Sequence, residues 1–307
     1  MTKDNKILIV GGTGFIGYHL AKKCLKKGWK VTSISSKFPK KIRYLKKVKY
    51  LFCDISKKKF LEKKINKYYK YVVNLGGYVD HSNKKKIFDS HHLGCKNLAE
   101  IFLKNPPKKF VQIGSSVEYG HLNSPQRENL KCSLSLIKSN YGKAKLLSTK
   151  YLMNLYKKVN FPITILRIYI VYGPRQDINR FIPIVIKSCL NNKKFDCSEG
   201  SQFRDFVHIE DVINAILKTL ASKKSHGEII NIGTGKPRKL KDIIQNIRKI
   251  LKGGKPQFGI IKLRKDEILK LYPNINKAKK KLNWSPKISF DKGLKSTINF
   301  YNGSKSK

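Results

Sequence analysis

A short apolar run near the start of the chain leads directly into a glycine-rich turn. Residues 7–10 are Ile-Leu-Ile-Val, and residues 11–17 are Gly-Gly-Thr-Gly-Phe-Ile-Gly, with the spacing G-x-x-G-x-x-G. The apolar run predicts a buried β-strand, and residues 15–27 have the pattern of the helix that follows it. Residues 7–27 therefore form a predicted strand–turn–helix unit. This unit constrains the fold more than any other feature of the chain.

The glycine spacing also predicts a ligand for this turn. One glycine permits the tight bend, another lets the backbone approach a pyrophosphate, and the third lets helix and strand pack closely. The helix N-terminus offers free N–H groups and a positive dipole end to phosphates. We therefore expect a dinucleotide cradle, with contacts from Gly11, Thr13, Gly14, Phe15, Ile16 and Gly17.

Apolar runs alternate with helical patterns through the first half of the chain. Further strands are predicted at residues 30–34, 50–53, 71–75, 110–113 and 163–168, and the clearest further helices at 91–103 and 141–157. Repeated strand–helix–strand units imply parallel pairing with right-handed crossovers and helices on both faces of the sheet. The predicted fold class is therefore α/β, with a Rossmann-type doubly wound parallel sheet.

The second half of the chain loses this alternation. We expect a short helix from Asp211, a strand at residues 229–232 and two basic helices towards the end. These elements predict a smaller, C-terminal substrate-binding lobe over the carboxyl edge of the sheet. The approximate division is residues 1–172 for the dinucleotide-binding domain and 173–307 for the lobe, and we expect the two parts to be intertwined.

Other features of the chain argue against a membrane protein, a secreted protein or a metalloprotein. No apolar run approaches the roughly 18 residues that a membrane span needs, and the N-terminal residues lack the pattern of a signal peptide. The six cysteines are scattered without a C-x-x-C pair, and no histidine lies at metal-ligand spacing. We expect a cytoplasmic protein with reduced thiols and no metal site.

The formal net charge of +48 is the most unusual bulk property of the chain. A basic surface can neutralise nucleic-acid phosphates, so a non-catalytic nucleic-acid binder is one interpretation. However, nearly all of the 67 basic residues are lysines, and they are spread along the chain. Nucleic-acid readers favour arginine for bidentate contacts and gather their charge on one face. We therefore favour a compositional bias and do not expect nucleic acid as the partner.

The end of the second predicted strand bears on the choice between NAD and NADP. In this fold an acid there binds the ribose 2′-hydroxyl of NAD and repels the 2′-phosphate of NADP. The position is Ser35, followed by Ser36 and Lys37, and residues 40–43 add three more cations. Hydroxyls and cations suit a phosphate, so we expect NADP(H), with NAD as the alternative.

A tyrosine and a lysine stand one helical turn apart in the predicted helix at residues 141–157. Tyr141 and Lys145 are at positions i and i+4 and so share a helix face. A nearby ammonium favours the phenolate. Tyr141 could then give or take a hydroxyl proton while a hydride moves at the adjacent carbon.

Further motifs accompany these two in a fixed order. They are Gly-Ser-Ser-Val-Glu-Tyr-Gly at 114–120, Val-Tyr-Gly-Pro-Arg at 171–175, Arg-Asp-Phe-Val at 204–207, Asn-Ile-Gly-Thr-Gly at 231–235 and Leu-Asn-Trp-Ser-Pro at 282–286. Together they resemble the extended short-chain dehydrogenase/reductase family, which includes NAD(P)-dependent nucleotide-sugar epimerases, dehydratases and 4-keto reductases. The resemblance runs from about Ile7 to about Tyr301.

The resemblance implies roles for residues outside the glycine turn. Ser115, four residues before Tyr119, would share the substrate oxygen with Tyr141, and Ser116 is the fallback. Adenine would contact Asp54 and Ile55, and the cofactor ribose would lie near the small residues at 75–77. These cofactor positions are Asp54, Ile55, Leu75, Gly76 and Gly77.

The resemblance also implies a substrate and an assembly. Arg204 and Arg264 match arginines that bind the diphosphate of a nucleotide-diphosphate sugar, and Asn179 matches an amide that contacts the nucleotide phosphates. Family members are often homodimers through a helical contact that would use the helix of Tyr141. His91 and Cys95 depart from the asparagine and threonine that the family often has there, so we expect altered packing near the site.

The chain lacks the pair of acidic residues that a dehydratase of this family uses, which argues against dehydration as its reaction. The family's 4,6-dehydratases carry an Asp-Glu pair directly after the active-site serine or threonine, where this chain has Ser116 and Val117. The missing acid at Ser35 favours NADPH-dependent reduction of a nucleotide-activated 4-keto sugar, and the run at 263–273 is similar to CDP-abequose and CDP-paratose synthases. An NAD-dependent nucleotide-sugar 4-epimerase is the alternative.

Overall fold

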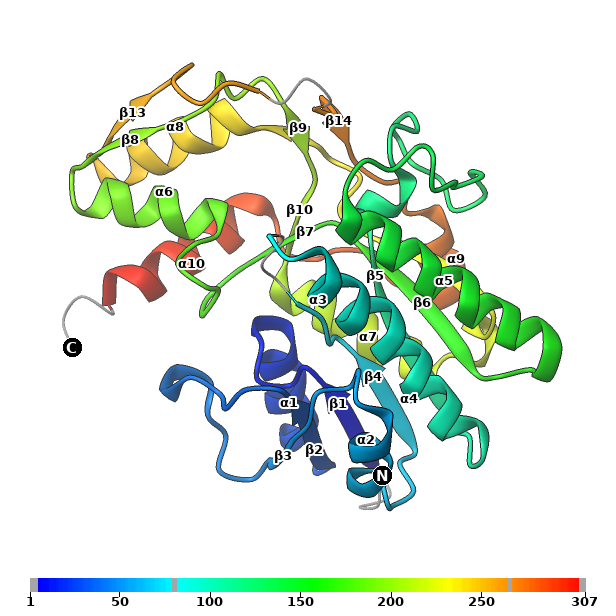
Figure 1. Cartoon of the computed structure of the whole chain (residues 1–307). Helices are drawn as coiled ribbons and strands as arrows, with labels where there is room; N and C mark the ends of the chain where they lie inside the picture. Colours follow the sequence, from blue (N-terminus) through cyan, green and yellow to red (C-terminus); the bar gives the residue numbers. More distant parts are fainter. Residues whose placement is uncertain (1–4, 79–81, 264–266, 304–307) are drawn as a thin grey trace.

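A seven-stranded parallel sheet forms the centre of the computed structural model, which describes residues 5–78, 82–263 and 267–303 (Figure 1). Its strands lie in the order β11-β6-β5-β4-β1-β2-β3. Their bounds are β1 Lys6–Val10, β2 Lys30–Ser35, β3 Lys49–Phe52, β4 Tyr71–Asn74, β5 Lys109–Ser115, β6 Ile163–Ile168 and β11 Glu228–Ile232. The order reverses between β1 and β4, and such a switch point is where doubly wound sheets bind their ligands. The predicted Rossmann-type fold is confirmed.

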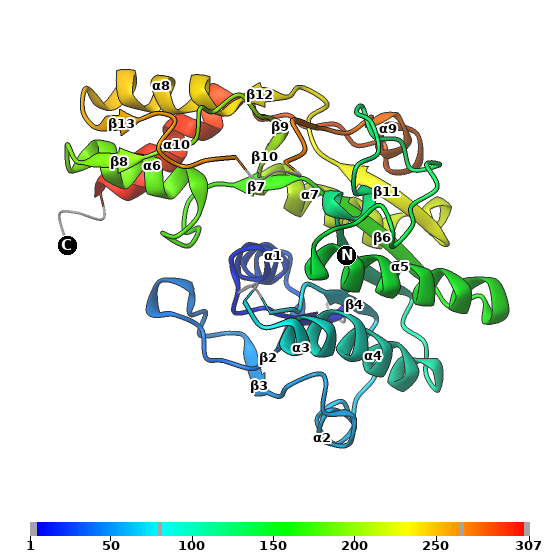
Figure 2. The same ribbon diagram turned by 45° about the horizontal axis from the view of Figure 1, so that its top comes forward.

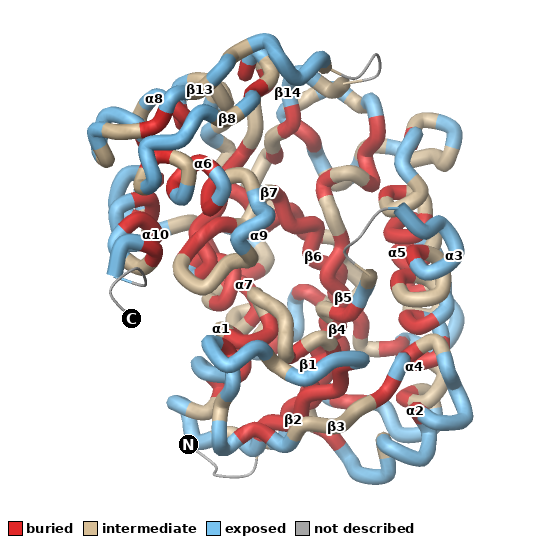
Figure 3. The backbone as a smooth tube through the Cα atoms, turned by 60° about the vertical axis from the view of Figure 1, so that its left-hand side comes forward, coloured by how far each residue is buried: buried red, intermediate tan, exposed pale blue. Residues whose placement is uncertain are grey.

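Helices cover both faces of this sheet, which explains why apolar side chains on both faces of its strands are buried. Along β1, Ile7 and Ile9 pack into one core cluster, whereas Leu8 and Val10 pack into the other. Figure 3 shows the buried strands between the more exposed helices. The helices of this part are α1 Phe15–Lys26, α2 Lys58–Lys64, α3 Lys84–Phe88, α4 Gly94–Leu103, α5 Asn140–Val159 and α7 Ile209–Ala221.

Two predicted helices differ from the structure at their first turn. The helix expected from His91 is preceded by a π-helical turn at Asp89–Leu93 and regains α-helical form in α4. The helix expected to be short and to start at Asp211 is α7, which starts at Ile209 and has 13 residues. Asp211 lies within the first turn of α7, and its carboxylate accepts hydrogen bonds from the backbone N–H groups of Lys287 and Ile288.

The second lobe has its own core and lies beyond the carboxyl ends of the sheet (Figure 2). Helices α6 (Phe181–Leu190), α8 (Leu240–Leu251) and α10 (Phe290–Gly303) surround this core. Its short strands are β7 Ile170–Tyr172, β8 Lys194–Asp196, β9 Phe203–Arg204, β10 Phe206–His208, β12 Arg238–Lys239, β13 Lys255–Gln257 and β14 Lys270–Leu271. The helix α9 (Asn276–Leu282) packs back against β11.

The chain returns to the central sheet after it has entered the second lobe. Strand β11 pairs in parallel with β6, and α7 packs against α1. Both elements therefore belong to the sheet layer although they follow residue 172. The division of the chain at residues 172 and 173 stays a prediction. Within the described residues, none of the helices is both long and apolar enough to span a bilayer.

A lysine is buried at the amino-terminal end of β5, at the edge of the sheet opposite the glycine turn. Lys109 is 1% exposed, and its Nζ donates to Ser225 Oγ at 3.0 Å and to Thr164 Oγ1 at 3.3 Å. Among the described residues, no carboxylate forms an ion pair with it. Burial lowers the pKa of Lys109 from 10.5 to about 7.

Lys109 should therefore make folding stability depend on pH. Between pH 7 and 10.5 the unfolded chain binds a proton that the folded chain does not, so stability rises with pH, by up to about 1.4 kcal/mol per unit. The variant Lys109→Met should lose this slope and be more stable at pH 7. Urea unfolding of both proteins at pH 7 and pH 9 measures the difference, and equal slopes would contradict the assignment.

Candidate active site

The turn between β1 and α1 brings three backbone segments into contact. Gly11 has φ +77°, and a Cβ there would lie 3.1 Å from the backbone of Leu75 and Gly76. A Cβ on Gly17 would lie 2.3 Å from Gly11 O. Only glycine fits at these two positions, because the helix and the end of β4 pack directly on the turn.

The N-terminus of α1 is open to a ligand. Among the described residues no side chain caps this end at Gly14, and the first turn of the helix contains no acid. The N–H groups of Phe15, Ile16 and Gly17 belong to this first turn, where they have no partner within the helix. Free donors and a positive dipole end fit the pyrophosphate of a dinucleotide.

The predicted ribose and adenine positions adjoin this turn. Ser35, at the end of β2, is 9% exposed, and its Oγ accepts the N–H of Thr13 at 3.4 Å. Ile55 is buried against Gly76, whose Cβ would lie 3.2 Å from Ile55 Cδ1. The exposed Asp54 carboxylate accepts the N–H of Ser56 at 2.9 Å. The exposed residues at this edge are Ser36, Lys37 and Asp54.

Two of the four cations that follow Ser35 pair with one acid from the second lobe. Lys40 Nζ lies 2.7 Å and Arg43 Nη2 lies 3.1 Å from the carboxylate of Asp177. Burial raises the pKa of Asp177, but these two cations outweigh it and lower the pKa below its ordinary value. Sequence reasoning missed Asp177, because it lies more than 130 residues from its partners.

Tyr141 and Lys145 lie on the face of α5 that meets β5. The helix is capped by Ser139, whose Oγ accepts the N–H of Gly142 at 3.1 Å. Lys145 is 4% exposed, and its Nζ donates to Ile113 O at 2.8 Å and lies 5.8 Å from the centre of the Tyr141 ring. Ile113 is two residues before Ser115, the last residue of β5. The structure thus links the predicted tyrosine–lysine pair to the strand that ends in the predicted serine.

His91 lies against Tyr141, near the site where the family resemblance led us to expect altered packing. Its ring meets the Tyr141 ring edge-on, with centroids 4.9 Å apart, and its Nε2 donates to Tyr78 O at 3.0 Å. A Cβ on Gly77 would lie 1.8 Å from the His91 ring, so Gly77 leaves room for the histidine.

Cys95 is fully buried nearby, and burial raises the pKa of its thiol to about 12, which makes it an unreactive packing residue.

Two of the three predicted substrate residues, Arg204 and Asn179, are described and lie in the second lobe. Arg204 in β9 donates through Nη1 to Phe203 O at 3.0 Å and through Nη2 to the carboxylate of Glu267. Sequence reasoning missed Glu267, which forms an ion pair with this guanidinium. Asn179 is exposed just before α6. Arg264 lies outside the described residues.

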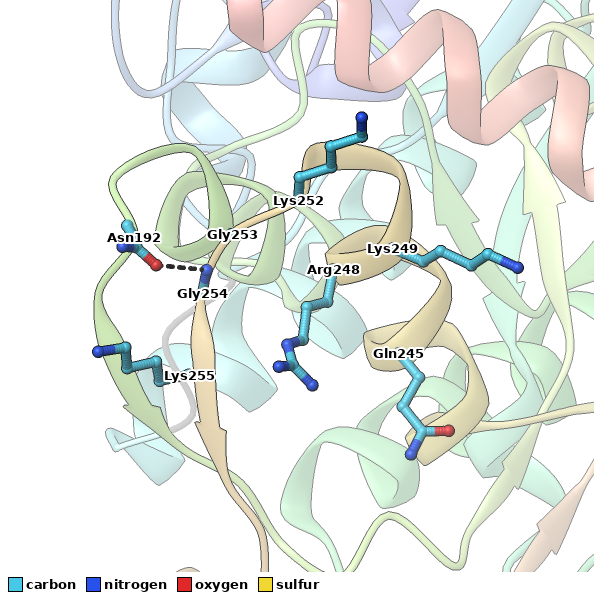
Figure 4. A pocket seen from close by; sticks show the side chains of 8 residues that line it. All are labelled: Asn192, Gln245, Arg248, Lys249, Lys252, Gly253, Gly254 and Lys255. Atoms are coloured by element: carbon cyan, nitrogen blue, oxygen red, sulfur yellow. Dashed lines mark hydrogen bonds between the residues drawn. The ribbon is translucent and has the colours of Figure 1, made fainter.

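A separate pocket of about 400 Å³ lies at the far end of the second lobe (Figure 4). Its side chains come from the end of α8, the start of β13 and the turn after α6. They are Asn192, Gln245, Arg248, Lys249, Lys252, Gly253, Gly254 and Lys255. None of the predicted cofactor or catalytic residues lines this pocket, so we do not assign the reaction to it.

Comparisons with known proteins agree with this fold. The chain matches the NAD dependent epimerase/dehydratase family over residues 7–233. It is 31% identical to UDP-glucuronate 4-epimerase of Thermodesulfobacterium geofontis, over 95% of each chain. It is 36% identical to CDP-abequose synthase of Salmonella muenchen, over 43% of this chain and 46% of that one.

A solved structure gives the same result for the fold. The crystal structure of UDP-glucuronic acid 4-epimerase from Bacillus cereus, in complex with UDP-glucuronic acid and NAD, superposes with a TM-score of 0.86. The two sequences are 27% identical, and the match covers 97% of this chain and 99% of that chain.

The close contact at Gly17 generates a prediction about dinucleotide binding. In Gly17→Ala the new Cβ would meet Gly11 O at 2.3 Å and Gly12 Cα at 2.6 Å, so the turn must move. We expect NAD(H) and NADP(H) to bind at least about 10-fold more weakly and the fold to lose roughly 1–3 kcal/mol. Calorimetric titration and urea unfolding measure both effects.

Gly303→Ala is the matched control for this variant. Among the residues that the structure describes, no atom lies within 4 Å of a Cβ at Gly303, the last residue of α10. Its dinucleotide affinity should equal that of the unmodified protein. If Gly17→Ala also bound the dinucleotides normally, the turn would not be the cradle.

Proposed function

Because the chain belongs to the NAD dependent epimerase/dehydratase family, within the extended short-chain dehydrogenases/reductases, we propose that it catalyses hydride transfer at C4 of a nucleotide-activated sugar. The observation that carries this proposal is the meeting of α5 and β5, where Lys145 connects Tyr141 to the strand end at Ser115. Strand β5 pairs with β4, and the end of β4 packs on the glycine turn where the dinucleotide is expected.

The side chains at this place can handle a proton on a substrate oxygen. Tyr141 gives or takes the proton of the sugar hydroxyl, and Ser115 hydrogen-bonds the same oxygen. The buried ammonium of Lys145 stabilises negative charge on the phenolic oxygen as the proton leaves. The nicotinamide dinucleotide, when bound, supplies or accepts the hydride.

Glu118, the acid that follows Ser115 in the chain, is not available as an acid or base for dehydration. Glu118 is 0% exposed, and its carboxylate accepts hydrogen bonds from Arg167 and Thr149. A dehydratase needs an acid and a base at adjacent sugar carbons, and residues 116 and 117 are serine and valine. This supports a reaction confined to C4.

We propose reduction of a 4-keto sugar by NADPH as the specific reaction. Ser35 places a hydroxyl, and no carboxylate, at the ribose position beside the glycine turn. The similarity to CDP-abequose synthase supports the same choice. The diphosphate of the nucleotide sugar would bind Arg204, after release of Glu267, together with Asn179 and Arg264.

A nucleotide-sugar 4-epimerase that retains NAD is the second candidate. One of the relatives that match nearly the whole chain is a UDP-glucuronate 4-epimerase. Asp177 also pairs with Lys40 and Arg43, which leaves fewer cations near Ser35 for a 2′-phosphate. A homodimer remains a prediction from the family resemblance.

The role of Tyr141 can be tested by removing only its hydroxyl. Tyr141→Phe retains the ring that packs against His91, so the cofactor should still bind, while turnover should fall by about 10² or more. NADPH oxidation with a 4-keto nucleotide sugar and chromatography of UDP-glucose and UDP-glucuronate follow the two candidate reactions. Tyr156→Phe, further along the same helix, should retain full turnover. Normal turnover in Tyr141→Phe would remove this residue from the mechanism.

The cofactor choice depends on Ser35. Ser35→Asp should weaken NADPH binding about 10-fold or more, because the new carboxylate repels the 2′-phosphate, and should improve NADH binding. Ser135→Asp adds the same charge at an exposed loop position and should leave the ratio of the two affinities unchanged. Fluorescence titration measures the affinities for both cofactors, and mass spectrometry identifies any dinucleotide that co-purifies. Tight retention of NAD by the unmodified protein would favour the epimerase.

A further inference from the structure

A single carboxylate lies beneath the strand end that carries Ser115. Glu118 Oε1 accepts the backbone N–H of Ser115 at 2.7 Å, and Oε2 accepts Thr149 Oγ1 at 2.7 Å and Arg167 Nε at 3.0 Å. The carboxylate therefore contacts β5, α5 and β6 at once. Glu118 itself belongs to the 3₁₀ turn that follows β5.

The surrounding residues are shaped to hold this carboxylate. A Cβ on Gly114 would lie 2.5 Å from Glu118 Oε1, so the glycine leaves the space that the carboxylate fills. Gly114 pairs with Arg167 in the β5–β6 register, which brings the arginine beside it. Arg167 is 2% exposed, and its Cζ lies 4.4 Å from the centre of the Tyr119 ring.

The charge of the carboxylate is matched by the arginine. Burial is the largest single influence on the pKa of Arg167 and lowers it, but the Glu118 carboxylate, together with Tyr119 and Cys132, outweighs burial and holds the pKa above its ordinary value. Both side chains are almost fully buried, so the pair is weakly screened by solvent. Hydrogen bonds to a charged acceptor are stronger than neutral ones, and the N–H of Ser115 donates to such an acceptor.

The helix α5 presents one row of side chains to this network. Tyr141, Lys145 and Thr149 are spaced four residues apart, and so they share a helix face. Lys145 donates to Ile113 O in β5, and Thr149 donates to Glu118. These two bonds fasten the helix to β5 at Ile113 and to the turn after β5 at Glu118.

We propose that Glu118 is a positioning residue that holds Ser115 in register with Tyr141. This inference rests on the proposed function, in which Ser115 and Tyr141 must contact the same substrate oxygen. Glu118 does not touch the substrate; it acts through the Ser115 backbone and through Thr149. A displacement of about 1 Å between reacting groups can lower a rate about 10²-fold, so small losses in this network should be measurable.

Thr149→Val removes one bond of the network and keeps the shape of the side chain. We expect kcat to fall about 10-fold with KM within about 2-fold, because binding groups are unchanged. The Ser115 N–H should exchange with solvent faster, as read by hydrogen exchange with fragment-resolved mass spectrometry over residues 112–118. Thr149→Ser, which retains the hydroxyl, should restore both values.

Thr219→Val is the matched control. Thr219 is a fully buried threonine of α7 whose hydroxyl donates to Ala215 O within its own helix. Thr219→Val should lose about as much folding stability as Thr149→Val, while kcat and the hydrogen exchange of the Ser115 N–H stay unchanged. Glu118→Gln, if it folds, should lower kcat about 10²-fold, since it leaves Arg167 without its counter-charge.

The outcomes separate this inference from the proposed function. Equal kcat and equal Ser115 exchange in Thr149→Val and Thr219→Val would overturn it. Faster exchange without loss of kcat would also overturn it, because the strand end would then move without affecting the reaction. If the unmodified protein turned over no nucleotide sugar, the proposed function would fail, and the exchange comparison would still decide whether Glu118 fixes the end of β5.

Discussion

The direct contact of backbone with backbone around Gly11 and Gly17 is the constraint on which the site depends. It sets the distance between α1 and the sheet, and it opens the N-terminus of the helix towards the ends of β1 and β4. Any side chain at these positions would push the helix away and close the space for a pyrophosphate. The strand order then places this turn at the switch point between β1 and β4, next to the end of β5.

A second set of contacts joins the lobes beside that turn. His19 of α1 donates to Pro174 O, and Arg43 donates to Arg175 O and pairs with Asp177. Burial lowers the pKa of His19 to about 4, so this histidine is neutral at physiological pH. The segment that leaves the sheet for the second lobe is therefore fastened to α1 and to the loop after β2.

The local elements of the fold were predictable, whereas many contacts between distant residues were not. The central strands lie within about two residues of the predicted positions, because buried parallel strands are apolar runs bounded by turns. The glycine spacing and the four-residue step from Tyr141 to Lys145 are local patterns too. The π-helical turn that brings His91 against Tyr141 has no such local signature, and neither does the burial of Glu118 beside Arg167.

The sequence by itself determined the fold class, the glycine turn and the row of side chains on α5, since each follows from the periodicity of strands and helices or from glycine's backbone freedom. Tertiary structure alone decided which acid meets which cation. With 67 basic and 19 acidic residues, the sequence offers several cations for every carboxylate. Asp177, Glu267 and Glu118 find their partners only where segments far apart in the chain are packed together. Pairing of this kind depends on distance and desolvation, and neither quantity is encoded in the local order of residues.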